Sequence, residues 1–130
     1  MPVAIDTSVL IAAEKAGDVS RFAAASAETF YIPALAATEF LIGTHPPVRE
    51  HLRERARRLY ENIFRDMVSP FEEADAAQLA ALESELRRTG RKMQFYDAAI
   101  AATAIARGDS LMVLDSDFDR LEDRLTLIKP

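Results

Sequence analysis

Short apolar runs alternate along the chain with longer stretches in which apolar residues return every three or four positions. The runs at 3–5, 30–32, 111–114 and 125–128 are of strand length and almost entirely apolar, so we expect them to be buried β-strands. Strands that alternate with helices in this way are typical of an α/β domain with a parallel sheet. The pattern therefore predicts a short, mainly parallel central sheet flanked by helices.

Helical periodicity and capping residues indicate where the helices lie. Gly17 and Gly108 stand where a left-handed residue ends a helix, and the pair Pro46-Pro47 interrupts another. We expect helices over 7–15, 18–25, 33–42, 48–64, 73–88 and 96–107.

The segment 66–69 is open to two interpretations. It can form a third short strand. Alternatively, Ser69 and Glu72 can form a capping box that starts the helix over 73–88. The amino-acid pattern does not choose between the two.

The expected helix over 48–64 is strongly amphipathic. Its apolar stripe can pack in the core, form a dimer contact or line a groove for a partner, and packing in the core is the commonest use. The stripe comprises Leu52, Leu59, Tyr60, Ile63 and Phe64. The outer face is rich in arginine with interspersed glutamate, which favours a solvated surface with Glu–Arg pairs at helical spacing.

Length and composition set the class of protein. A chain of 130 residues with 49% apolar residues suits one domain over 1–130 with a core of its own. The sequence has no Cys, which excludes a disulfide, a thiolate zinc site and a thiol nucleophile. Its two histidines, His45 and His51, lie close together, which argues against a distributed Ser/His/Asp triad.

The sequence shows no pattern of export or membrane insertion. The segment after Met1 lacks a basic region and has Asp6 inside its first apolar run, unlike a signal peptide. The most apolar stretch, 98–106, is about half of the roughly 20 residues that span a bilayer. We therefore expect a cytoplasmic protein with no membrane partner.

Acidic residues stand where the expected strands end or where helices begin. Asp6 follows the first strand directly, Asp115 follows the strand at 111–114, and Asp117 comes two residues later. Glu39 lies two turns into the helix after the second strand, and Asp97 begins the last helix. Because the active sites of parallel α/β sheets lie beyond the carboxyl ends of the strands, we expect these acids to converge.

Each acid also has an ordinary structural explanation. A lone Asp at the start of a helix caps it, Glu39 can face solvent, and the segment 115–117 can form a turn. Four acids at one edge would repel one another, by roughly 4 kcal/mol for a pair about 4 Å apart at an effective dielectric constant of about 20. A hard divalent cation, Mg²⁺ or Mn²⁺, removes that penalty and prefers carboxylate and water oxygens.

The segments around these acids resemble the motifs of PIN-domain nucleases. The run IDTSVLIA at 5–12 is similar to the first motif, and IPALAATEF at 32–40 to the second. YDAAIAA at 96–102 resembles the third, and VLDSDF at 113–118 the fourth. The motifs occur in the right order over nearly the whole chain, and the size of the chain is similar to that of the VapC toxins.

The resemblance implies a three-layer PIN-like fold and a metal-dependent endoribonuclease that is the toxin of a toxin–antitoxin pair. It implies Mg²⁺ or Mn²⁺ as cofactor, RNA as substrate, a homodimer, and a small antitoxin protein as partner. The catalytic and metal-site acids that the motifs imply are Asp6, Glu39, Asp97 and Asp115, with Asp117 as a secondary metal ligand. The cation would lower the pKa of a bound water for in-line attack on a phosphodiester.

Residues beside these motifs are candidate RNA contacts. Arg91 and Lys92 belong to a group of four cations within six residues, which suits contact with phosphate. Tyr96 adjoins the third motif and can stack on a base, and a structured RNA loop with unpaired bases is the expected target. Thr7, beside the first acid, is also a candidate contact.

Val113 departs from the family pattern, in which Thr or Ser is common at this position. Any hydroxyl interaction at this position is therefore missing or is supplied by Ser116 or Thr7. The departure leaves the four acids of the motifs intact.

An acid-rich α/β domain can also have other functions. An aspartyl phosphatase would need a second acid at the position of Ser8, and a receiver domain would need an adjacent acid pair after the first strand. A PIN-like protein-interaction module with weak or lost catalysis stays open, as does a PIN nuclease that processes RNA without being a toxin. Intact acids at all four motif positions favour catalysis.

The net charge of −5 argues against a nucleic-acid partner only weakly, because net charge averages over faces that a ligand meets one at a time. Four of the five excess negative charges belong to the proposed ligands, which leaves −1 for the rest of the chain. We therefore expect the acidic composition to be compatible with RNA once a cation is bound.

Overall fold

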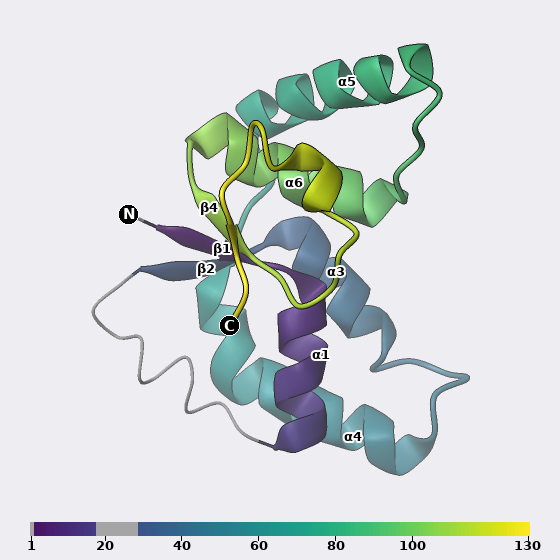
Figure 1. Ribbon diagram of the computed structural model, residues 1–130. Helices are drawn as coiled ribbons and strands as arrows, with labels where there is room; N and C mark the ends of the chain where they lie inside the picture. The colour runs from purple at the N-terminus through teal and green to yellow at the C-terminus, as the bar shows by residue number, and fades with distance from the viewer. Residues whose placement is uncertain (1, 18–28) are drawn as a thin grey trace.

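A computed structural model describes residues 2–17 and 29–130 of the chain. The helix expected over 18–25 lies outside the described residues. Within them, five short strands form one sheet and five α-helices surround it (Figure 1). No helix in the described ranges is both long and apolar enough to cross a membrane.

All neighbouring strands of the sheet run parallel, in the order β3-β2-β1-β4-β5. The strands are β1 (Val3–Ile5), β2 (Phe30–Pro33), β3 (Val68–Ser69), β4 (Ser110–Met112) and β5 (Leu127–Ile128). The central strand β1 has β2 on one side and β4 on the other. This arrangement confirms the predicted α/β class with a parallel sheet.

The helices are α1 (Thr7–Ala16), α3 (Ala34–Ile42), α4 (Glu50–Leu59), α5 (Glu73–Arg88) and α6 (Phe95–Arg107). Figure 1 shows α5 and α6 on one side of the strands, and α1 and α4 on the other. Helices on both faces of a parallel sheet give the three-layer plan that the sequence predicts.

Helix α6 forms the centre of the core. Every residue from 98 to 104 is buried, and five of these seven are alanine. Small side chains allow α5 to pack closely along α6. The one buried hydroxyl in this stretch, that of Thr103, donates a hydrogen bond to the carbonyl oxygen of Ala99 (2.9 Å), so it carries no unpaired donor into the core.

The helix predicted over 48–64 differs from the observed one. Helix α4 begins at Glu50 and ends at Leu59, and the chain continues through a π-helical turn, η1 (Tyr60–Phe64), and a short 3₁₀ segment, η2 (Arg65–Met67). The wider turn places Phe64 fully in the core, with its ring edge-on to that of Phe40 at 5.3 Å. Most of the apolar stripe thus packs in or against the core, its commonest use.

The two interpretations of segment 66–69 are resolved in favour of the strand. Val68 and Ser69 pair with the end of β2, while Asp66 belongs to the preceding 3₁₀ segment. The alternative interpretation, a Ser69–Glu72 capping box, is wrong. The capping contact lies three residues further on, where the amide of Glu72 donates to the carboxylate of Asp75 (2.8 Å).

The last two strands are shorter than predicted. β4 ends at Met112 rather than at Leu114, so Asp115 does not follow the strand directly. The amide of Leu114 turns away from the sheet and donates to the hydroxyl of Ser8 (3.1 Å). That bond moves the chain from the sheet edge toward the start of α1, where the predicted acids lie.

Candidate metal centre

Asp6 joins β1 to α1 and is almost fully buried, with 2% of its surface exposed. Its Oδ2 accepts hydrogen bonds from the amide of Ser8 (3.1 Å) and from the Ser8 hydroxyl (2.5 Å). Asp6 is therefore the N-cap of α1, as the ordinary explanation of a lone Asp expects. The cap occupies only one of the two carboxylate oxygens.

The other oxygen, Oδ1 of Asp6, is buried and has no hydrogen-bond partner in the described part of the chain. A buried acceptor without a partner costs about 1–3 kcal/mol, and more when it is charged. Burial raises the pKa of Asp6, the hydrogen bonds from Ser8 oppose that rise, and the charge of Asp115 adds to it. Such an oxygen is suited to a ligand that brings positive charge.

Asp97 lies in the first turn of α6, and its pKa depends on the acids around it. Burial is the largest cause that raises its pKa, to about 7, and the next four causes are the negative charges of Asp6, Asp117, Glu39 and Asp115. The five acids that the sequence singled out, from four separate segments, thus lie near enough for the charges of the other four to act on Asp97. Repulsion among neighbouring carboxylates disfavours their charged forms, and a bound cation would relieve it.

The hydroxyl of Ser8 connects two of these segments. It donates to Asp6 and accepts from the amide of Leu114, so it fixes the chain after β4 against the start of α1. Sequence reasoning missed Ser8 and assigned a compensating hydroxyl to Ser116 or Thr7 instead. The signal lay in the spacing, because a residue two positions after an N-cap Asp faces that carboxylate.

The loop that carries Asp115 and Asp117 is held by its own hydrogen bonds. Oδ1 of Asp115 accepts from the amide of Asp117 (3.1 Å), which is the turn that the ordinary explanation of this segment expects. The ammonium group of Lys129 donates to the carbonyl oxygen of Asp115 (2.8 Å) and to the carboxylate of Asp119 (3.2 Å). Both Asp115 and Asp117 are exposed, so they form the open side of the cluster.

Among the described residues, no group of three or more His, Asp or Glu side chains is arranged so that it could hold a metal ion by itself. The residues present nevertheless fit a hard divalent cation of the Mg²⁺ kind. Such an ion takes only one or two carboxylates directly and keeps several waters. The buried oxygen of Asp6 that has no partner in the described residues, together with the acids whose charges act on Asp97, would provide that kind of partial ligand set.

The side chain of Thr7 does not lie on the surface of the protein. It is buried, with 3% of its surface exposed, and its hydroxyl points to the carbonyl oxygen of Ala36 at 3.5 Å. Its position as the first residue of α1, packed against α3, explains why the side chain turns inward. The hydroxyl of Thr7 thus points toward α3 rather than solvent, and an RNA contact by Thr7 stays a prediction.

The remaining RNA candidates lie around the start of α6. Arg91 and Lys92 are exposed in the connection between α5 and α6, and Tyr96 is half-buried. Phe95, which the sequence reasoning passed over, is the more accessible aromatic, with 55% of its surface exposed. Its ring meets that of Tyr96 edge-on at 5.7 Å.

Comparison with known proteins identifies the family. Residues 3–124 match the family model described as the PIN domain. The chain is 32% identical over 126 residues to Ribonuclease VapC1 of Rickettsia felis, covering 94% of this chain and 92% of the relative. The chain therefore belongs to the PIN-domain family and, within it, to the VapC group.

Solved structures share the fold. DNA-bound VapBC from Salmonella typhimurium is 21% identical, with a TM-score of 0.79 and coverage of 98% of this chain and 97% of that one. VapBC-5 from Mycobacterium tuberculosis, a member of a family of toxin–antitoxin systems, is 23% identical, with a TM-score of 0.74 and coverage of 98% and 95%. The predicted PIN-like fold is confirmed.

Proposed function

We propose that this chain is a metal-dependent endoribonuclease, the toxin of a VapBC-type toxin–antitoxin pair, and that residues 1–130 form its single catalytic domain. The observation that carries the proposal is the unpaired, buried oxygen of Asp6 within a group of five mutually repelling acids. The relation to Ribonuclease VapC1 supplies the substrate class. Cytoplasmic RNA is the proposed substrate.

The metal site consists of Asp6, Glu39, Asp97 and Asp115, with Asp117 as a secondary ligand. Mg²⁺ or Mn²⁺ is the proposed ion, because these cations prefer carboxylate and water oxygens. When bound, the ion supplies positive charge for the phosphate and makes a water more acidic.

The residues of the chain prepare the site in three ways. The hydrogen bonds from Ser8 fix Oδ2 of Asp6 and leave Oδ1 free toward the cluster. The same Ser8 hydroxyl and the ammonium group of Lys129 hold the loop that carries Asp115. A site fixed before the substrate binds loses little free energy to reorganisation during the reaction.

Accessible residues at the start of α6 suit single-stranded RNA. The exposed ring of Phe95 offers a stacking surface for an unpaired base, beside Tyr96. Arg91 and Lys92 offer positive charge to phosphates. An unpaired loop of a structured RNA is the proposed target, because its bases can be splayed onto such a surface.

A groove between α1, α3 and α4 is the proposed antitoxin contact. It has a volume of about 300 Å³. Its apolar lining is Ile11, Phe40, Val48, Leu52 and Ala56, and Glu39 of the acid cluster stands in the same lining. A small antitoxin seated here would reach the acids directly. The proposed assembly is a homodimer of toxin chains, each with its antitoxin.

The test is RNA cleavage by the purified chain, with mapping of the cut ends. We expect cleavage with Mg²⁺ or Mn²⁺, none with EDTA, and a loss of at least about a hundredfold in Asp97→Asn. Asp66→Asn is the matched control, because Asp66 is exposed on η2 and outside the group of acids that act on Asp97. Undiminished cleavage by Asp97→Asn would overturn the site, and inactivity of the wild type with both metals would favour a PIN-like interaction module.

A further inference from the structure

A second charged feature lies outside the acid cluster, in a groove between the C-terminal end of α5 and the segment after β4. The groove has a volume of about 430 Å³. Its lining residues are Glu85, Leu86, Arg88, Thr89, Arg91, Arg120, Leu121 and Arg124. Four of these eight are arginines and one is acidic, which is a local excess of three positive charges in a chain with a net charge of −5. We call it the arginine groove.

One wall of the arginine groove is the end of α5. Arg88 is the last residue of the helix, and Gly90 then takes a left-handed conformation with φ 68°. The amide of Arg91 closes the turn by donating to the carbonyl oxygen of Leu86 (2.9 Å), the usual pattern of a glycine-ended helix. The side chains of Arg88 and Arg91 are exposed and have no ion pair or hydrogen bond in the described part of the chain.

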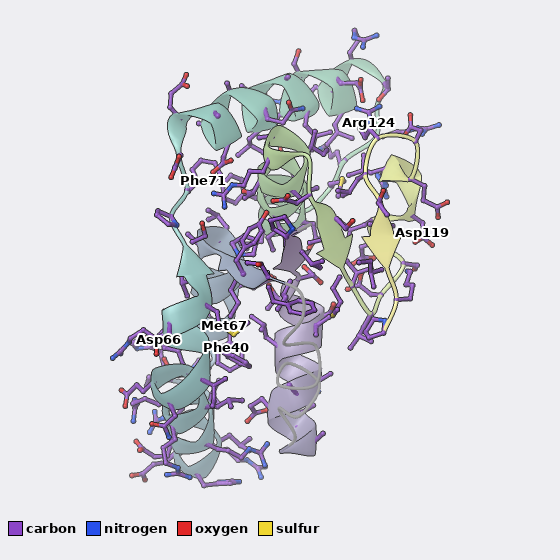
Figure 2. The ribbon with its side chains drawn as sticks, turned by 90° about the vertical axis from the view of Figure 1, so that its left-hand side faces the viewer. Phe40, Asp66, Met67, Phe71, Asp119 and Arg124 are labelled. Atoms are coloured by element: carbon purple, nitrogen blue, oxygen red, sulfur yellow. The ribbon has the colours of Figure 1, made fainter. Side chains whose placement is uncertain are left out.

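The opposite wall is the short 3₁₀ segment η3 (Asp119–Leu121) and the residues after it. Leu121 is buried and anchors this wall to the core. The guanidinium of Arg120 donates to the carbonyl oxygen of Lys92 (2.9 Å). Arg124 forms an ion pair with Glu85 of α5 at 2.6 Å, and Figure 2 shows Arg124 beside that end of α5. These two contacts hold the walls at a fixed separation.

Stabilisation of the helix end accounts for part of this charge. Cations in the last turn of a helix interact favourably with its dipole, which explains the presence of Arg88. Arg124 is paired with Glu85 and Asp123, but the dipole does not explain Arg91, beyond the helix, or Arg120, which comes from another segment. Arginine is also the residue that matches phosphate with a planar pair of donors.

Both walls of the arginine groove are close in sequence to acids of the cluster. Asp117 stands two residues before η3, and Asp97 stands five residues after Lys92, whose carbonyl oxygen Arg120 binds. The two features are therefore linked by short stretches of chain, and we expect an RNA strand that lies across the acids to continue along the arginine groove.

We propose that the arginine groove binds the phosphate backbone of the RNA substrate on its way to the acid cluster, with Arg88, Arg91 and Arg120 as the phosphate contacts. The inference rests on the proposed ribonuclease function and adds the residues that hold the strand away from the cut. Contacts of this kind are independent of sequence and depend strongly on salt. The arginine groove therefore strengthens the binding of RNA, and cleavage takes place at the acid cluster.

The test is the salt dependence of RNA binding. The double variant Arg88→Gln/Arg91→Gln is compared with Arg53→Gln/Arg58→Gln, which removes the same charge from α4 on a different part of the chain. The probe is a short fluorescent single-stranded RNA of mixed sequence, bound in EDTA so that no cleavage occurs. KM is measured separately with Mg²⁺.

For the groove variant we expect the slope of log K against log salt to fall by about 1.4, because each phosphate of a single strand that is no longer neutralised lowers the slope by about 0.7. KM should rise at least about tenfold, while kcat stays near that of the wild type. Arg120→Gln should show about half of the change in slope. The α4 control should match the wild type.

The outcomes separate the two levels of the proposal. If the wild type cuts RNA and the groove variant has the slope and KM of the α4 control, the groove inference is overturned and the ribonuclease stands. If the wild type neither binds nor cuts RNA, the proposed function fails and the inference fails with it. An equal decrease of slope in both double variants would also overturn the groove, because the effect would then come from net charge alone.

Discussion

Asp6 uses its two carboxylate oxygens differently. Oδ2 caps α1 through Ser8, and Oδ1 is buried without a partner in the described residues. The capping role is therefore confirmed for Oδ2, and Oδ1 is left for the proposed metal ligand. A lone N-cap Asp has its oxygens near solvent or backbone donors, whereas this one is kept dry beside other acids.

The raised pKa of Asp97 predicts how stability depends on pH. Its pKa is 3.8 as an ordinary carboxyl group and about 7 in the folded chain. Between these values the folded state holds a proton that the unfolded state has released, so stability falls as pH rises. Above about pH 7 both states are ionised and the fall stops.

Thermal unfolding in EDTA tests this prediction. We expect Asp97→Asn to match the wild type near pH 4 and to become progressively more stable than it up to about pH 7, because Asn never acquires the repelled charge. Added Mg²⁺ should stabilise the wild type more at about pH 8 than at about pH 5. A constant difference between the two proteins across this range would contradict the clustered arrangement.

At the scale of single residues, the sequence predicts which acids lie together but not which hydrogen bonds fix their positions. Asp6, Glu39 and Asp97 could be selected because their positions relative to strands and helices follow from periodicity. The hydroxyl bridge of Ser8 and the exposure of Phe95 depend on how two segments distant in sequence pack together. Periodicity within one segment carries no information about that contact.

At the scale of elements, a buried ion pair ties α5 to the end of α6. The guanidinium of Arg107 donates to the carboxylate of Asp75 (2.8 Å), to the hydroxyl of Ser69 (2.8 Å) and to the carbonyl oxygen of Pro70 (2.8 Å). It also lies over the ring of Tyr31, at 5.1 Å. Burial raises the pKa of Asp75, but the hydrogen bonds from Arg107 and from a backbone amide outweigh it and hold the pKa below its usual value.

Removal of this carboxylate should destabilise the fold. Asp75→Ala leaves the Arg107 charge without its partner, and loss of one member of a buried pair costs about 3–5 kcal/mol. We expect the free energy of unfolding, measured by urea titration, to fall by about 3 kcal/mol, with little change for the exposed neighbour in Glu73→Ala. A change below about 0.5 kcal/mol in Asp75→Ala would show that α5 is held by apolar packing alone.

Most elements were predictable from the sequence, because strands and helices differ in the period of their apolar residues. The exceptions have specific causes. The π-helical turn at Tyr60–Phe64 places Phe64 against Phe40, and that partner comes from another helix. The early end of β4 follows from the bond between Leu114 and Ser8, which also crosses between segments.

At the scale of the whole molecule, a local excess of each sign of charge is found. Five acids act on one another around Asp97, and four arginines line the arginine groove at the end of α5. A net charge of −5 does not reveal these local differences, because a ligand meets one face of a protein at a time. The proposed ribonuclease function requires that the acid cluster bind a divalent cation.

Calorimetric titration of Mn²⁺ into the purified chain, without RNA and at about pH 8, tests that claim most directly. The wild type and the Asp66→Asn control should bind Mn²⁺ with the same affinity, and Asp97→Asn should bind it at least about tenfold more weakly because it lacks one carboxylate of the cluster. Equal affinity in Asp97→Asn, or no binding to the wild type, would contradict the account.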